Sequence, residues 1–116
     1  MPRRQPDFTH RLAPFTTRLK VFLYPAGELI YRDPTYQAVT VQNRRGGVSV
    51  HLRPGTPPGT VCHESVHVAL FVLQVHGVDE HEGVGEALAY LSAHIFELLR
   101  KDQSAHRAAA RATVSV

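Results

Sequence analysis

The chain has 116 residues, 43% hydrophobic and 20% charged, so its length suits one domain with one hydrophobic core. No apolar run approaches the roughly 18 residues that cross a bilayer, which argues against a membrane protein. The sequence pI is about 9.4, but the formal charge is only +3 and no basic run is interleaved with aromatic residues. This pattern predicts a solvated surface and argues against a nucleic-acid partner.

The first half of the chain reads as an arm followed by short strands. Residues 1–15 hold three prolines and no clear period, which predicts an extended N-terminal arm. From Thr17 to Tyr24, apolar and polar residues alternate as a half-buried strand requires. Three further strands are predicted, the last two joined as a hairpin by an Arg-Arg-Gly-Gly turn, at residues 28–32, 37–42 and 48–53.

The apolar period then changes from that of a strand to that of a helix. We expect one helix from about Thr60 to Val75 and a second from about Val84 to Lys101, leaving residues 102–116 as a tail. Gly77 suits the left-handed residue that follows a helix. Strands followed by helices predict an α+β fold, in which a small antiparallel sheet packs on a pair of antiparallel helices within residues 16–101.

The first of these helices contains the pattern His-Glu-x-x-His, as His63, Glu64 and His67. Residues four apart lie on one helix face, so both imidazoles can reach one metal ion at about 2.0–2.1 Å. Glu64 is offset by about 100° around the helix, where it can reach a water molecule on the metal and act as a general base. The pattern therefore favours a zinc site, with Glu64 as the catalytic residue.

A zinc site of this kind needs a third protein ligand and leaves a fourth position for water. The best candidate is Glu86 on the second helix, which an antiparallel helix pair would return towards the two histidines. The alternatives lie in the linker between the helices and are Asp79, His81 and Glu82.

Chance and a purely structural origin are the competing explanations. The chain has 8 histidines, yet shuffling its composition would produce the pattern only about 0.03 times. The alternative is a pair of surface histidines on an amphipathic helix. Cys62, next to His63, points away around the helix, and we interpret it as a buried structural thiol.

The segment HESVH, followed after 18 residues by EALAY, resembles the gluzincin zinc peptidases. Residues 48–98 also resemble small proteins encoded among the structural and tail-assembly genes of tailed bacteriophages. The resemblance implies a minimal zincin-like core in which His63, His67 and Glu86 bind zinc and Glu64 is the base. It also implies that the strand VSVHL, residues 48–52, is the edge strand that holds a peptide substrate.

The chain departs from the gluzincin pattern in two ways. Gly85 stands where those enzymes usually have asparagine, and only 30 residues follow Glu86, where they carry a large subdomain that supplies an oxyanion donor. Here that donor would have to be Tyr90, our first choice, or His94 or His51. The metal site therefore carries over better than the peptidase activity does.

Two functions from different classes follow from this resemblance. The first is a zinc-dependent hydrolase of the metallopeptidase type, which acts on a peptide or protein. The second is a phage virion or tail-assembly protein, which keeps the metal site for stability or for docking on other phage structural proteins. The expected location is the cytoplasm of the host cell, with the virion as the alternative.

Overall fold

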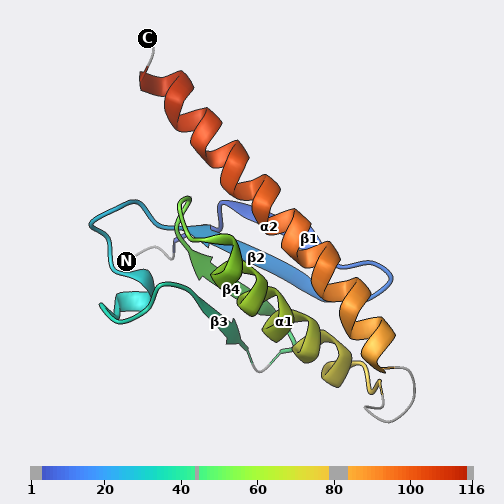
Figure 1. The fold of residues 1–116 in the computed structure, drawn as a ribbon. Helices are drawn as coiled ribbons and strands as arrows, with labels where there is room; N and C mark the ends of the chain where they lie inside the picture. The colour runs from blue at the N-terminus through green and yellow to red at the C-terminus, as the bar shows by residue number, and fades with distance from the viewer. Residues whose placement is uncertain (1–3, 44, 79–83, 115–116) are drawn as a thin grey trace.

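The computed structural model describes residues 4–43, 45–78 and 84–114, within which a four-stranded sheet packs against two helices (Figure 1). The α+β fold predicted from the sequence is confirmed. The elements are β1 (Phe8–Arg11), β2 (Arg18–Leu23), the 3-10 turn η1 (Ile30–Arg32), β3 (Val39–Gln42), β4 (Val48–Leu52), α1 (Pro58–Val75) and α2 (Val84–Val114).

The sheet is mixed, with the strand order β1-β2-β4-β3. The β3–β4 hairpin is antiparallel, as predicted, and β1 pairs antiparallel to β2, but β2 and β4 run parallel. Alternating apolar residues reveal that a strand is half-buried, but they do not say which neighbour it pairs with or in which direction. The sequence therefore predicted β2 and β4 themselves but not their parallel pairing.

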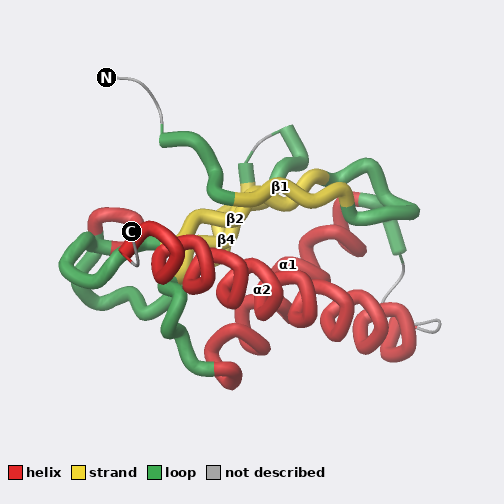
Figure 2. Tube along the Cα trace, turned by 90° about the horizontal axis from the view of Figure 1, so that it is seen from above, coloured by secondary structure: helices red, strands yellow, loops and turns green. Residues whose placement is uncertain are grey.

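Both helices cover the same face of the sheet (Figure 2) and run antiparallel to each other (Figure 1). Their inward residues meet the apolar residues of β2 and β4 in a single core, in which Val21, Val50, Val61, Val72 and Ile95 are all 0% exposed. Among the residues that the structure describes, neither helix has the length and apolar character that would carry it across a membrane.

The predicted arm and tail are both partly built into the domain. Phe8–Arg11 forms β1 at the edge of the sheet, and α2 continues without a break to Val114. β1 and α2 are in contact at His10, whose Nε2 lies 2.7 Å from the carboxylate of Asp102. The next residue on α2, Gln103, is fully buried. The sequence did not predict this because β1 has one strongly apolar residue, Phe8, and because polar residues anchor the tail.

The predicted strand over residues 28–32 is instead the 3-10 turn η1. Tyr31 (φ 50°) and Arg32 (φ 60°) both adopt left-handed backbone conformations, which an extended strand cannot contain. Gly77 has φ 69° directly after the end of α1, as its position predicted.

Replacing Gln103 by Met should destabilise the protein by about 1–3 kcal/mol. Gln103 Nε2 donates to the carbonyl oxygens of Arg53 (3.0 Å) and Thr56 (3.1 Å), and the thioether would leave both of them unpaired in the interior. Urea unfolding measures the loss, with Ser104→Ala at the neighbouring exposed position as the control. Equal stability of the two variants would show that these hydrogen bonds between α2 and the loop contribute nothing to the free energy of unfolding.

Candidate functional site

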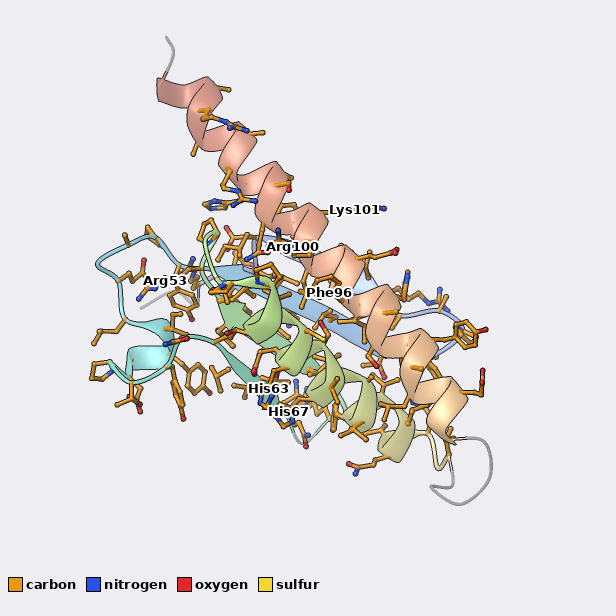
Figure 3. All side chains as sticks on the ribbon, viewed as in Figure 1. Arg53, His63, His67, Phe96, Arg100 and Lys101 are labelled. Carbon is orange, nitrogen blue, oxygen red and sulfur yellow. The ribbon has the colours of Figure 1, made fainter. Side chains whose placement is uncertain are left out.

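His63 and His67 lie on the side of α1 that faces β3 (Figure 3). Their Nε2 atoms are 3.0 Å apart and the two rings meet edge to face, with centroids separated by 4.6 Å. Two nitrogen ligands of a tetrahedral zinc ion, each at about 2.0–2.1 Å, are about 3.3 Å apart. The two imidazoles therefore already have nearly the spacing that a shared metal ion requires, and both side chains are exposed.

Glu64 lies beside this pair but is only 5% exposed. The hydroxyl of Thr40 on β3 donates to its carboxylate, with 3.1 Å between Oγ1 and Oε1. Together with the two histidines, these residues line a shallow groove of about 270 Å³ between α1 and β3, whose other walls are Ala38, Val39 and Gln42. The His-Glu-x-x-His residues therefore line a groove, and Thr40 fixes the position of the Glu64 carboxylate.

The strand beside the groove is β3, whose outer edge has no partner strand in the described sheet. The resemblance had implied that residues 48–52 form this edge, but these residues form β4, which lies between β2 and β3. This correction moves the available sheet edge to Val39–Gln42. Sequence reasoning missed Thr40 as a site residue. The signal that could have identified it is a hydroxyl residue within an otherwise apolar strand, at a position whose side chain faces the helices.

Glu86 does not join the histidine pair. No three His, Cys, Asp or Glu side chains within the described ranges are grouped so that they could hold one metal ion. After His67, α1 continues for about two more turns before the chain reverses, so Glu86, in the first turn of α2, returns near the far end of α1. The linker alternatives Asp79, His81 and Glu82 lie outside the described residues.

None of the three residues named as oxyanion donors lines the groove. Tyr90 is 74% exposed on α2, so it belongs neither to the groove nor to the core, and His94 on the same helix is also exposed. His51 projects from β4 towards the sheet face that the helices leave uncovered, because it alternates with the core residues Val50 and Leu52. The neighbour of His63, Cys62, is exposed and not the buried thiol that we predicted.

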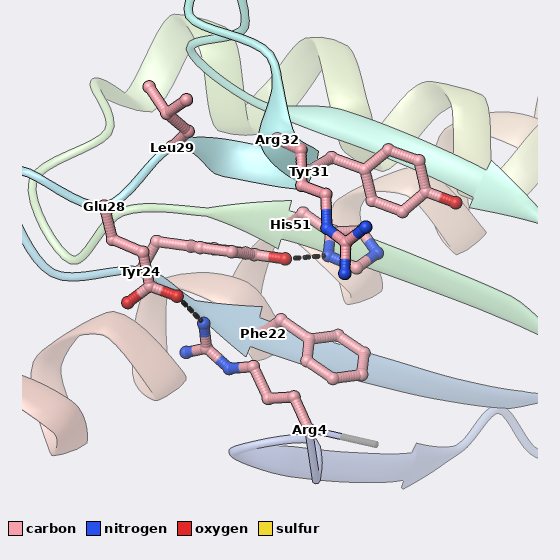
Figure 4. A pocket seen from close by; sticks show the side chains of 8 residues that line it. All are labelled: Arg4, Phe22, Tyr24, Glu28, Leu29, Tyr31, Arg32 and His51. Atoms are coloured by element: carbon pink, nitrogen blue, oxygen red, sulfur yellow. Dashed lines mark hydrogen bonds and ion pairs between the residues drawn. The ribbon is translucent and has the colours of Figure 1, made fainter. Parts of the chain in front are cut away.

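His51 lies in a second and larger pocket, of about 720 Å³, on that uncovered face (Figure 4). The hydroxyl oxygen of Tyr24 lies 2.8 Å from Nδ1 and that of Ser49 lies 2.9 Å from Nε2, and the Phe22 ring stacks on the imidazole at 4.7 Å. Burial, and to a smaller extent the positive charge of Arg4, lowers the pKa of His51 from 6.5 to about 4. At neutral pH the ring is therefore uncharged, with each nitrogen beside a hydroxyl.

Acid should weaken the fold through His51. Its pKa is depressed in the folded state, so the unfolded chain binds more protons between pH 6.5 and 4, and stability falls as the pH falls through this window. The contribution reaches about 3 kcal/mol. Urea unfolding of wild type and His51→Gln from pH 7 to 4 measures this contribution. The difference between their free energies of unfolding should shrink as the pH falls. His94→Gln is the control at an exposed position. A constant difference between wild type and His51→Gln would contradict the assignment.

Comparison with known proteins adds no family to this description. No protein-family model matches the chain, and neither a curated protein nor a solved structure shows significant similarity to it. A functional assignment for the chain therefore rests on the two histidines, the carboxylate and the sheet edge of the groove.

Proposed function

We propose that the chain is a zinc-dependent hydrolase that cleaves a peptide held in the groove between α1 and β3. One observation carries this proposal. The Nε2 atoms of His63 and His67 converge to 3.0 Å beside a carboxylate, at the mouth of a groove along β3, whose outer edge has no partner strand in the described sheet. Each histidine would supply one imidazole ligand, and zinc, when bound, would polarise the scissile carbonyl.

The edge of β3 favours an extended peptide as the substrate. An exposed strand edge presents unpaired N–H and C=O groups, and an extended peptide can add to it as a further strand. Val39–Gln42 is long enough to align a few residues of substrate beside the histidine pair. Main-chain pairing of this kind gives affinity without selecting a sequence, so the side chains around the groove would supply specificity.

Glu64 is the proposed proton acceptor. Its burial and the hydrogen bond from Thr40 hold the carboxylate in one position, which a general base needs if it is to meet a water molecule in the right geometry. Because Thr40 belongs to the substrate-binding strand, a peptide that pairs with β3 would lie close to this carboxylate.

The second candidate is a metal-holding protein without catalysis, as expected for a phage virion or tail-assembly component. The position of Tyr90 favours it, because a tyrosine that is 74% exposed outside the groove cannot stabilise an oxyanion within it. In this function the exposed edge of β3 would dock on another phage structural protein.

Zinc titration tests the metal site that both candidates share. Wild type should bind one zinc ion, and His63→Ala or His67→Ala should weaken binding roughly a hundredfold or more, because each removes one imidazole ligand. His94→Ala removes an exposed histidine from α2 and should bind zinc like wild type. Equal zinc affinity in all four proteins would remove the basis for both candidates.

Glu64→Gln separates the two candidates. The amide cannot accept the proton, so hydrolysis of a mixed peptide library by the zinc-loaded protein should fall about a hundredfold or more while zinc binding is retained. Product peptides are counted by mass spectrometry. Zinc binding without hydrolysis in wild type would instead support the non-catalytic function, and hydrolysis that is unchanged in Glu64→Gln would exclude this residue as the base.

A further inference from the structure

The sheet face opposite the helices carries the larger pocket, which the proposed hydrolase does not use. The groove at α1 lies on the helix side of the sheet, where Thr40 meets Glu64. The second pocket lies on the other side, where Phe22 and His51 project between the core residues of β2 and β4. The two sites are therefore separate, and each can be tested without disturbing the other.

Aromatic rings from three segments form the wall of this pocket (Figure 4). Phe22 lies parallel to His51 within 6°, and the ring of Tyr31 meets the same imidazole edge-on, with centroids 4.9 Å apart. The contacts of His51 with Tyr24 and Ser49 hold this cluster in place. Tyr31 remains 49% exposed, so the cluster presents aromatic surface to a further flat ring.

Two arginines stand at the rim of the pocket. Arg4 lies over the Tyr24 ring, with its guanidinium carbon 4.3 Å from the centroid, and it is paired with Glu28 at 2.9 Å. Arg32 is exposed and makes no hydrogen bond or ion pair with any residue in the described part of the chain. One cation is therefore already neutralised, and the other is free to meet an anion.

The backbone that presents this free cation is strained. Tyr31 and Arg32 are consecutive non-glycine residues with φ of 50° and 60°, a left-handed conformation that side-chain-bearing residues rarely adopt. Two such residues place an exposed aromatic ring and an unpaired guanidinium side by side over one pocket. Strain of this kind often accompanies a binding site, because the rest of the fold must hold the residues in place.

A flat ring that carries an anion matches this lining. The ring would stack on the exposed aromatic surface of Tyr31 and Phe22, and the anion would meet Arg32. Further basic residues continue along the same sheet face, because Lys20 and Arg18 are exposed on β2 at two and four residues from Phe22. A row of cations beyond a stacking site suits the successive phosphates of a nucleic-acid strand.

We propose that the pocket of Phe22, Tyr31, Arg32 and His51 binds a nucleotide, with its base on the aromatic rings and its phosphate at Arg32. The nucleotide is either free or part of a single strand that runs on towards Lys20. The cations and rings come from separate stretches of the sequence and meet only on the folded sheet.

Three probes test the proposal and distinguish a free nucleotide from a single strand as the ligand. AMP is titrated by calorimetry, and fluorescein-labelled oligouridylate and oligothymidylate of about 12 nucleotides are titrated by anisotropy at several salt concentrations. Tighter binding of an oligonucleotide, weakening with salt, identifies a single strand, whereas AMP binding as tightly as the oligonucleotides identifies a free nucleotide. Either result supports the pocket, and no binding of any probe overturns it.

Four variants place the binding in this pocket. Tyr31→Ala and Arg32→Ala should each weaken binding about tenfold, whereas Tyr31→Phe, which keeps the ring, should bind like wild type. Tyr90→Ala is the matched control, because it removes an exposed tyrosine from α2.

Lys101→Ala is the charge control for Arg32→Ala, because Lys101 is exposed on α2 at the helix side of the sheet (Figure 3). It should leave the affinity unchanged. Loss of binding in Lys101→Ala equal to that in Arg32→Ala would reduce the interaction to net charge, and unchanged binding in Tyr31→Ala would exclude the stacking site. Circular dichroism confirms that the variants, all altered at exposed positions, remain folded.

Discussion

The parallel pairing of β2 with β4 is the constraint on which the rest of the molecule depends. It sets Leu19 opposite Val48, Val21 opposite Val50 and Leu23 opposite Leu52, so one continuous apolar surface faces the helices. Burial of these six side chains against α1 and α2 removes most of the apolar surface of both strands from water. The intervening residues necessarily point to the opposite face, which gives the sheet two chemically different sides.

Each side of the sheet then offers a different candidate site. On the helix side, β3 extends the sheet beyond β4 and brings Thr40 against Glu64, with the two histidines of α1 above the free edge. On the uncovered side, the same alternation brings Phe22 beside His51, and the turn η1 folds Tyr31 over them. The groove beside the two histidines exists because β3 lies outside β4 at the edge of the sheet. The pocket around His51 exists because β2 and β4 are neighbours.

Local patterns in the sequence predicted the local features well. Strong alternation located β2 and the β3–β4 hairpin, and the helical period located α1 and the start of α2. Elements with a weak apolar pattern were not predicted, because tertiary contacts decide their structure. The strand β1 contains little apolar surface, and the buried Gln103 in the last half of α2 is held by carbonyl groups of a loop about 50 residues away in sequence. The basic residues looked scattered because their neighbours on the folded surface come from distant segments.

The sequence by itself determined the relation of His63 to His67, because four residues on one α-helix must place two side chains on one face. It also determined the α+β class, since the spacing of apolar residues along the chain indicates which segments are strands and which are helices. Only the tertiary structure decided what surrounds that face. It brought Thr40 to Glu64, left Glu86 outside the pair and turned His51 to the other side of the sheet. Those outcomes depend on strand order and on where α1 ends relative to α2, and no local pattern of residues encodes either.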